Sequence, residues 1–197
     1  MQGKELKLTL PVPVSINSLY VNQFRFNPKT RRREPTGGRV LSSAGEKSKE
    51  QIQFHAKKQL AEQEWDYEWT EGKNNFLYLD AIIYFSRRGR DSDNVYKLLH
   101  DSLEKIIFDN DSRILARTQK VLYDKDNPRI EIVFSPVSYV GIFDSQKEAD
   151  EFKENCTDCT RYLQGRCSIL SDSLIGTVRE EIGSVDAPEC VEYKKKS

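Results

Sequence analysis

Regular alternation of leucines and polar residues predicts the first strand of this chain. The alternation has period two over residues 6–10, which is typical of a strand with one buried face. The Pro-Val-Pro run at residues 11–13 ends it, because proline donates no hydrogen bond to a sheet.

A helix is predicted after the serine pair Ser42 and Ser43. Either serine can cap the first turn, and Glu46, three residues after Ser43, completes a capping box. Apolar residues then recur every four positions and define one buried stripe: Ile52, Ala56 and Leu60.

The middle of the chain predicts a strand, a helix and two more strands. The aromatic and β-branched run at residues 76–85 indicates a central strand. Asp91 or Asp93 can cap the helix that follows. The apolar face of that helix has helical spacing: Val95, Leu98, Leu99, Leu103 and Ile106. The last two strands are expected over residues 114–123 and 129–134.

The order of these elements predicts the fold class. The sequence β-α-β-α-β-β implies an α+β domain, with a mixed sheet of about four strands and two packed helices. Residues 21–40 combine basic residues with prolines and glycines and lack apolar periodicity, so we expect a mobile loop there. Near Ser145 the alternation of predicted strands and helices ends, and a charged stretch followed by all four cysteines begins. We therefore expect a main domain over residues 1–144 and a C-terminal segment over residues 145–197 that begins with a short charged helix at 145–155.

Composition excludes several classes of protein. Hydrophobic residues make up 37% of the chain, enough for a core, so wholesale disorder is not expected. No apolar run reaches the roughly 18 residues of a membrane helix, and the polar start lacks the apolar region of a secretory signal. These features favour a cytoplasmic protein with no membrane partner.

Charge is distributed unevenly, although the formal net charge is zero. Residues 21–40 carry six positive side chains and one negative, whereas residues 145–197 carry eight positive and eleven negative. This asymmetry suggests an anionic partner for the first part of the chain.

The richest chemistry lies at residues 87–97. Asp91 and Asp93 stand at a strand-to-helix junction, where their carboxylates can converge, and Lys97 shares the helical face of Asp93. Residues 108–113 add further carboxylates. Clustered carboxylates repel one another unless a cation neutralises them, which favours a hard divalent metal.

Arginines in the same turn extend this interpretation to phosphodiester cleavage, in which a metal activates water while arginine and lysine stabilise the additional negative charge of the transition state. The alternative is that Asp91 and Asp93 only cap a helix and that the arginines belong to a solvated loop.

Three segments of the chain resemble the RusA family of Holliday-junction resolvases. They are residues 8–17, which read Leu-Thr-Leu-Pro-Val-Pro-Val-Ser-Ile-Asn, residues 90–97 and residues 108–114. The middle segment matches the family's Arg-Asp-x-Asp-Asn-x-x-Lys core in full. The last segment reads Asn110-Asp111-Ser112-Arg113 where the family usually has Asp-Asp-x-Gln, which leaves the role of Asp109 open. The resemblance covers about residues 4–135 and not the cysteine-bearing tail.

The resemblance implies a homodimeric, Mg²⁺-dependent endonuclease of bacterial or phage origin. Such an enzyme cuts four-way DNA junctions by paired nicks in recombination and repair. Carried over position by position, the catalytic residues are Asp91, Asp93 and Asp111 as metal ligands, with Lys97 assisting at the scissile phosphate. Arg90 contacts DNA beside the site, and Lys120 faces it from a following strand.

Further DNA contacts are expected from arginines outside the motif. Arg87 and Arg88 present forked donors suited to the phosphate backbone. The basic loop, with Arg31, Arg32 and Arg33, can bind phosphates, and the two phenylalanines at positions 24 and 26 can stack on an unpaired base. The alternative for both segments is a solvated surface without a partner.

Only two histidines occur, His55 and His100. His100 lies seven residues after Asp93, roughly on the same helical face, but we expect a satisfied surface histidine. No arrangement typical of serine–histidine or cysteine–histidine catalysis is present.

All four cysteines lie in the C-terminal segment: Cys156, Cys159, Cys167 and Cys190. Their spacing suits one tetrahedral metal site, with Zn²⁺ as the expected ion. An iron–sulfur cluster, free thiols and disulfides are the alternatives, disulfides being disfavoured in a reducing cytosol. The segment is short and polar, so we expect no core of its own and a metal that supplies much of its folding energy.

Three other functions remain open from the sequence. One is a catalytically degenerate protein that only binds branched DNA. The second is a nuclease that acts on flaps or other branched DNA. The third is a redox-sensing regulator that works through the cysteines.

Overall fold

The computed structural model describes residues 5–196 and divides the chain into two compact units. The N-terminal unit ends at Pro136 and the C-terminal unit begins at Val137. This division precedes the boundary expected at 144/145, because Ile142 and Phe143 pack into the core of the C-terminal unit. Within residues 5–196, no helix combines the length and the apolar character needed to cross a membrane.

The N-terminal unit is an α+β fold built on a mixed four-stranded sheet, as predicted. Its strands lie in the order β1-β6-β4-β5. The β4–β5 pair is parallel, and the other two pairs are antiparallel. All four predicted strands are confirmed: β1 (Leu6–Pro11), β4 (Leu77–Phe85), β5 (Ile114–Tyr123) and β6 (Arg129–Pro136).

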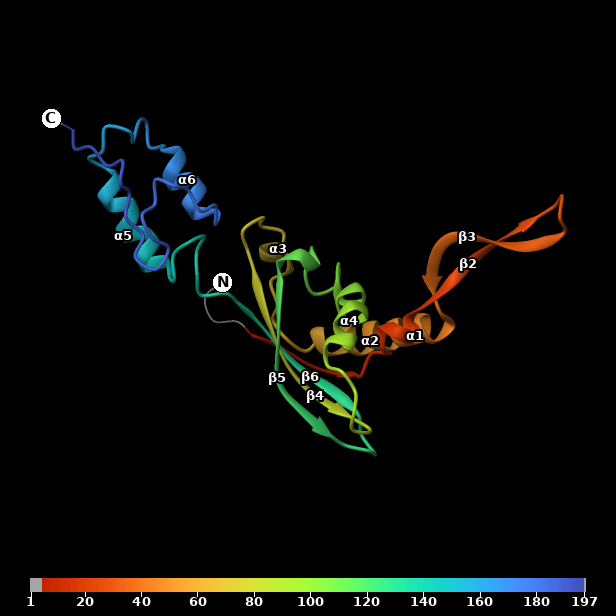
Figure 1. The fold of residues 1–197 in the computed structure, drawn as a ribbon. Helices are drawn as coiled ribbons and strands as arrows, with labels where there is room; N and C mark the ends of the chain where they lie inside the picture. The colour runs from red at the N-terminus through yellow and green to blue at the C-terminus, as the bar shows by residue number, and fades with distance from the viewer. Residues whose placement is uncertain (1–4, 197) are drawn as a thin grey trace. The chain divides into compact units, whose positions relative to one another are not determined.

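Two helices, α2 (Ser43–Leu60) and α4 (Tyr96–Leu103), pack against one another and against the sheet (Figure 1). Alternate residues of β1, β4 and β6 are buried, which gives the sheet one continuous apolar face. Ser42 caps α2, since its hydroxyl accepts a hydrogen bond from the Gly45 N–H at 3.0 Å. The remaining helical segments are short: α1 (Ile16–Leu19), α3 (Tyr67–Thr70) and the 3₁₀ turns η1 (Asp93–Val95) and η2 (Asp111–Arg113).

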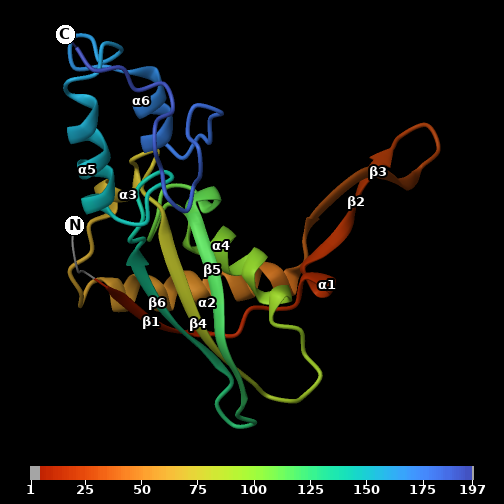
Figure 2. The same ribbon diagram turned by 60° about the vertical axis from the view of Figure 1, so that its left-hand side comes forward.

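The mobile loop expected over residues 21–40 is wrong, because these residues form a hairpin of β2 (Tyr20–Asn27) and β3 (Arg32–Leu41). Figures 1 and 2 show the hairpin extending away from the four-stranded sheet. Neither strand has a buried face, so the periodicity that reveals other strands is missing here. The Glu34 carboxylate holds the turn by accepting hydrogen bonds from Asn27 (2.9 Å) and Thr30 (2.7 Å).

The C-terminal unit contains α5 (Gln146–Cys156) and α6 (Ser168–Leu174). The predicted charged helix corresponds to α5, and its cap is Ser145. The expectation that this segment has no core is wrong. A small apolar cluster joins both helices to the flanking loops: Ile142, Phe143, Ala149, Phe152, Ile169, Leu170 and Ile182.

Candidate active site

Asp91 and Asp93 lie in the connection between β4 and α4. The Asp91 carboxylate accepts a hydrogen bond from the backbone N–H of Asp93 at 3.1 Å, which fixes the two residues in one turn. The prediction that one of them caps the helix is wrong for α4. This helix begins at Tyr96 after the turn η1, and no side chain caps it.

Asp111 begins η2, in the connection that leads from α4 to β5. Its carboxylate lies close enough to α4 to act electrostatically on Lys97 and His100. The pKa of Lys97 is raised, chiefly by its hydrogen bond to Asp101 at 2.8 Å, and the Asp111 charge adds to this. Lys97 therefore carries a positive charge beside Asp111 at neutral pH.

Tyr96 links the start of α4 to β5. Its hydroxyl lies 2.5 Å from the Thr118 hydroxyl. Burial raises the pKa of Tyr96, and the Asp93 carboxylate acts in the same direction. Asp93 is thus near the phenol of Tyr96, at the N-terminal end of α4.

The three motif aspartates differ from the other aspartates around them. Within residues 5–196, Asp91, Asp93 and Asp111 form no ion pair. The neighbouring aspartates each hold a cation: Asp80 with Arg117, Asp101 with Lys97, and Asp109 with both Lys105 and Arg113. The three motif carboxylates thus differ from these neighbouring aspartates in being available to an external cation.

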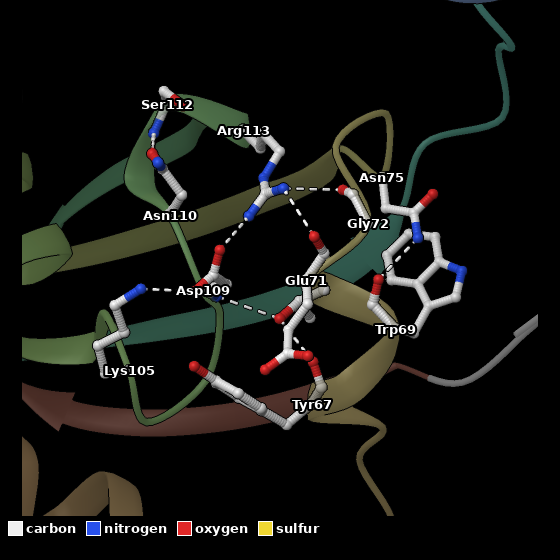
Figure 3. A network of polar contacts seen from close by, with 11 residues as sticks. Tyr67, Trp69, Glu71, Gly72, Asn75, Lys105, Asp109, Asn110, Ser112 and Arg113 are labelled. Atoms are coloured by element: carbon white, nitrogen blue, oxygen red, sulfur yellow. Dashed lines mark hydrogen bonds and ion pairs between the residues drawn. The ribbon is translucent and has the colours of Figure 1, made fainter.

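Asp109, whose role the sequence left open, anchors the segment that carries Asp111 (Figure 3). Its ion pairs with Lys105 and Arg113 lower the pKa of the Asp109 carboxyl. Its backbone N–H also donates to the Thr70 hydroxyl at 3.1 Å. The Asp109 carboxylate is therefore already neutralised by two cations of the chain itself.

The two positions that depart from the expected Asp-Asp-x-Gln pattern also have structural contacts. The Asn110 side chain accepts a hydrogen bond from the Ser112 N–H at 2.9 Å and caps η2. The Arg113 guanidinium donates to the Gly72 carbonyl at 2.8 Å and to Asp109 at 2.7 Å, with only 11% of its side chain exposed. Figure 3 shows both groups on the same short segment. The departures thus stabilise the loop without replacing Asp111.

The donor chemistry of the three motif aspartates fits Mg²⁺, which prefers carboxylate oxygens. As the side chains stand, no group of three or more His, Cys, Asp or Glu residues within 5–196 is arranged to hold a metal ion. Asp91 and Asp93 are exposed, so their side chains can reorient at little cost.

The arginines that precede Asp91 are placed on the same connection. Arg87 and Arg88 are exposed, and the Arg88 guanidinium lies 5.5 Å from the Tyr123 ring centre. The Arg90 guanidinium lies 5.3 Å from the ring centre of Phe85 at the end of β4. These arginines therefore lie on the same connection as the acidic turn, immediately before it in sequence.

Lys120 does not join this group. A β-bulge in the β4–β5 pair inserts Gln119, so that Ala81 pairs with Thr118 and Ile82 pairs with Lys120. Ile82 alternates with the buried residues of β4, which places Lys120 on the face of the sheet opposite α4.

The hairpin displays Arg31, Arg32 and Arg33 at its exposed end. Arg31 occupies the turn with φ of 54°, and the other two begin β3. Arg33 pairs with Phe26, and Phe24 lies on the same face two residues away. The two phenylalanines are 59% and 53% exposed, respectively.

His100 contradicts the expectation of a satisfied surface histidine. Its ring is partly buried beside Tyr96 and Phe108, at centroid distances of 6.0 Å and 6.3 Å. Within residues 5–196, its Nε2 is buried and has no hydrogen-bond partner. Burial lowers the pKa of His100. In the sequence, only the seven-residue spacing between Asp93 and His100 indicated that this histidine lies on the side of the helix that faces the acidic residues.

The four cysteines are brought together in the C-terminal unit, where all are free thiols lining one pocket. Comparison with known proteins covers only the other unit. A family model described as Endodeoxyribonuclease RusA matches residues 23–134. No curated protein matches the chain significantly. The family match includes the acidic turn, Lys97 and Asp111, and it ends before the cysteines.

Proposed function

The chain belongs to the RusA endodeoxyribonuclease family, and we propose that it resolves four-way DNA junctions by Mg²⁺-dependent paired nicks in recombination and repair. The family match spans residues 23–134, more than half of the 197 residues. Membership makes the protein an endodeoxyribonuclease of the Holliday-junction resolvase type.

One observation carries the proposed site. Asp91, Asp93 and Asp111 lie around α4 without an ion pair inside the described part of the chain, whereas the neighbouring aspartates are paired. We assign the metal-binding role to these three carboxylates. When bound there, Mg²⁺ would supply Lewis-acid stabilisation of a phosphoryl oxygen and favour ionisation of water.

The remaining work falls to cationic side chains of the chain itself. Lys97 is held by Asp101 and stays protonated, so its ammonium group can offset the charge that develops on the phosphate. Arg90 lies next in sequence to the acidic turn and can bind the adjacent phosphate through its forked donors.

The DNA interface is proposed to extend from this site to the hairpin. Arg87, Arg88 and the arginines at positions 31–33 supply exposed positive charge. Phe24 and Phe26 offer stacking surfaces for an unpaired base. Lys120, on the edge strand β5, would meet DNA only on the face of the sheet opposite α4.

We also propose a cytoplasmic homodimer, because paired nicks across a two-fold junction require two active sites. The N-terminal unit would then act as the nuclease and the C-terminal unit as an appendage. The zinc expected at the four cysteines is a separate proposal, because those residues lie in the other unit and outside the family match.

Cleavage of end-labelled synthetic DNA tests this function. Full-length protein is incubated with a four-way junction, a flap and a linear duplex of the same sequence, each with Mg²⁺ or with a chelator. We expect symmetric nicks in the junction, only with Mg²⁺. Preferential cleavage of the flap would redirect the proposal to other branched DNA. Tight junction binding without cleavage would contradict the nuclease and support a degenerate binding protein.

A further inference from the structure

The C-terminal unit gathers four thiols from distant positions of the chain around one cavity. Cys156 ends α5, Cys159 lies in the turn that follows, Cys167 directly precedes α6, and Cys190 lies near the end of the chain. The turn is closed by a hydrogen bond from the Cys159 N–H to the Cys156 carbonyl at 3.0 Å. The cavity is also lined by apolar side chains, including Phe152.

The thiols are unpaired although they are neighbours. All four cysteines are free, so no disulfide accounts for their convergence. All four cysteine side chains line the same pocket, together with apolar residues such as Ile169 and Leu170. In such a setting a thiolate is costly without a cation.

Backbone contacts hold the end of the chain beside the turn that carries Cys159. The Thr160 N–H donates a hydrogen bond to the Lys194 carbonyl at 2.7 Å, and the Tyr162 N–H donates to the Cys159 carbonyl at 3.0 Å. Cys159 also pairs with Lys195 in an isolated β-bridge, which brings the end of the chain to the turn. Contacts of this kind position the residues around a metal ligand.

We propose that Cys156, Cys159, Cys167 and Cys190 bind one Zn²⁺ ion, which holds the C-terminal unit in its folded state. Binding converts four thiols into four thiolates, each bonded to the ion, and releases four protons to solvent. The present side-chain arrangement does not enclose an ion within residues 5–196. The proposal therefore includes rotation of the thiol groups about χ1 toward the shared cavity.

The ligand set favours zinc, because Zn²⁺ is the usual ion of a closed site made of four cysteine thiolates.

The architecture of the unit explains why a metal is needed. Cys156, Cys167 and Cys190 pack directly against the small apolar core, and Cys159 is itself buried. After α6, residues 175–196 contain no helix or strand apart from isolated bridges. A metal bound by Cys190, within this segment, and by the three cysteines that precede it would fix the path of the segment where few apolar contacts are available.

Metal analysis of full-length protein purified without a chelator tests the proposal. We expect one zinc per chain by mass spectrometry of the elements, and release of that zinc when a mercurial reagent modifies the thiols. Iron with a visible charge-transfer band would overturn the assignment of zinc. Metal-free protein with four readily modified thiols would overturn the site, as would a mass showing the loss of thiol hydrogens to disulfides.

Two variants separate ligand loss from general damage. Cys190→Ser should lose bound zinc, whereas Ser171→Ala, at an exposed position on α6, should keep it. If Cys190→Ser is too unstable to purify, the thiol-modification experiment on the wild type still decides. Both tryptophans, Trp65 and Trp69, lie in the N-terminal unit. Their fluorescence should stay unchanged when zinc is released, and zinc content equal in both variants would contradict the proposal.

Discussion

The two units place their candidate chemistry differently with respect to their cores. In the N-terminal unit, Asp91, Asp93 and Asp111 lie in turns outside an apolar core that is complete without them. In the C-terminal unit, three of the four cysteines pack against the core and the fourth is buried. The three aspartates are therefore not needed for the fold of their unit, whereas the four cysteines are part of the packing of theirs.

This difference predicts opposite consequences of losing each site. Removing an unpaired carboxylate from a turn takes away a reaction and little stability. Removing a thiol from the C-terminal pocket takes away a metal ligand and the packing around it. Substitutions in the N-terminal unit should therefore change activity, and substitutions in the C-terminal unit should change stability.

The largest effect is expected from Asp111→Asn. This change should slow Mg²⁺-dependent junction cleavage by roughly 1,000-fold or more, because it removes a charged metal ligand, while junction binding is retained. The measurement is single-turnover cleavage. The matched control is Asp109→Asn, two residues away, which removes a paired carboxylate and should leave most of the cleavage rate intact. An equal loss of cleavage rate in the two variants would contradict the distinction between paired and unpaired aspartates.

A backbone change should destabilise only the C-terminal unit. Gly141 has φ of 60°, and a Cβ there would lie 2.0 Å from the Ser173 carbonyl oxygen. Gly141→Ala should therefore cost about 2–4 kcal/mol, measured by hydrogen exchange. Gly165→Ala has a similar φ of 78° but open space, so about 1 kcal/mol is expected. Cleavage should persist in both variants, and loss of cleavage in Gly141→Ala would contradict the separation of the units.

The hairpin should contribute to affinity and not to the chemical step. Replacing Arg31, Arg32 and Arg33 with alanine should weaken junction binding roughly 10–100-fold. It should also reduce the number of counterions released on binding, read from the slope of log affinity against log salt concentration, by up to about three. Fluorescence anisotropy at several salt concentrations measures both quantities. The double variant Lys57→Ala with Lys58→Ala on α2 is the control. A salt dependence unchanged by the arginine substitutions would remove the hairpin from the interface.

The smallest effect concerns pH and Asp109. Its carboxyl pKa is lowered in the folded state, chiefly by Lys105 and then by Arg113. The stabilising contribution is therefore fully present above the unfolded-state pKa and is lost as pH falls through the lower, folded-state pKa. Asp109→Asn should be less stable than wild type at neutral pH, and the difference should vanish in acid. Thermal unfolding between neutral and acidic pH measures this, and a difference independent of pH would argue against the ion pairs.

The sequence predicted the elements whose apolar residues face a core. The strands β1, β4 and β6 and the helix α2 show clear periodicity because each buries one face. The hairpin was missed because both of its faces are exposed, and its turn depends on hydrogen bonds to Glu34. The core of the C-terminal unit was missed because its residues are scattered over loops and two short helices.

The candidate site could be predicted only in part. Sequence spacing alone grouped Asp91, Asp93 and Lys97, which lie within seven residues of one another, whereas Asp111 was assigned by the family resemblance. Sequence could not reveal which carboxylates are paired, since Arg117 reaches Asp80 from another strand. The bulge that turns Lys120 away from α4 is likewise a property of strand register that local composition does not encode.

Divalent-cation binding tests the central contrast most directly. Mn²⁺ can substitute for Mg²⁺ at carboxylate sites, and its electron paramagnetic resonance signal reports binding without any cleavage. In titrations of full-length protein, we expect Mn²⁺ binding in the wild type and in Asp109→Asn and its loss in Asp111→Asn. Equal Mn²⁺ binding in all three proteins would contradict the assignment of the unpaired aspartates as the metal site.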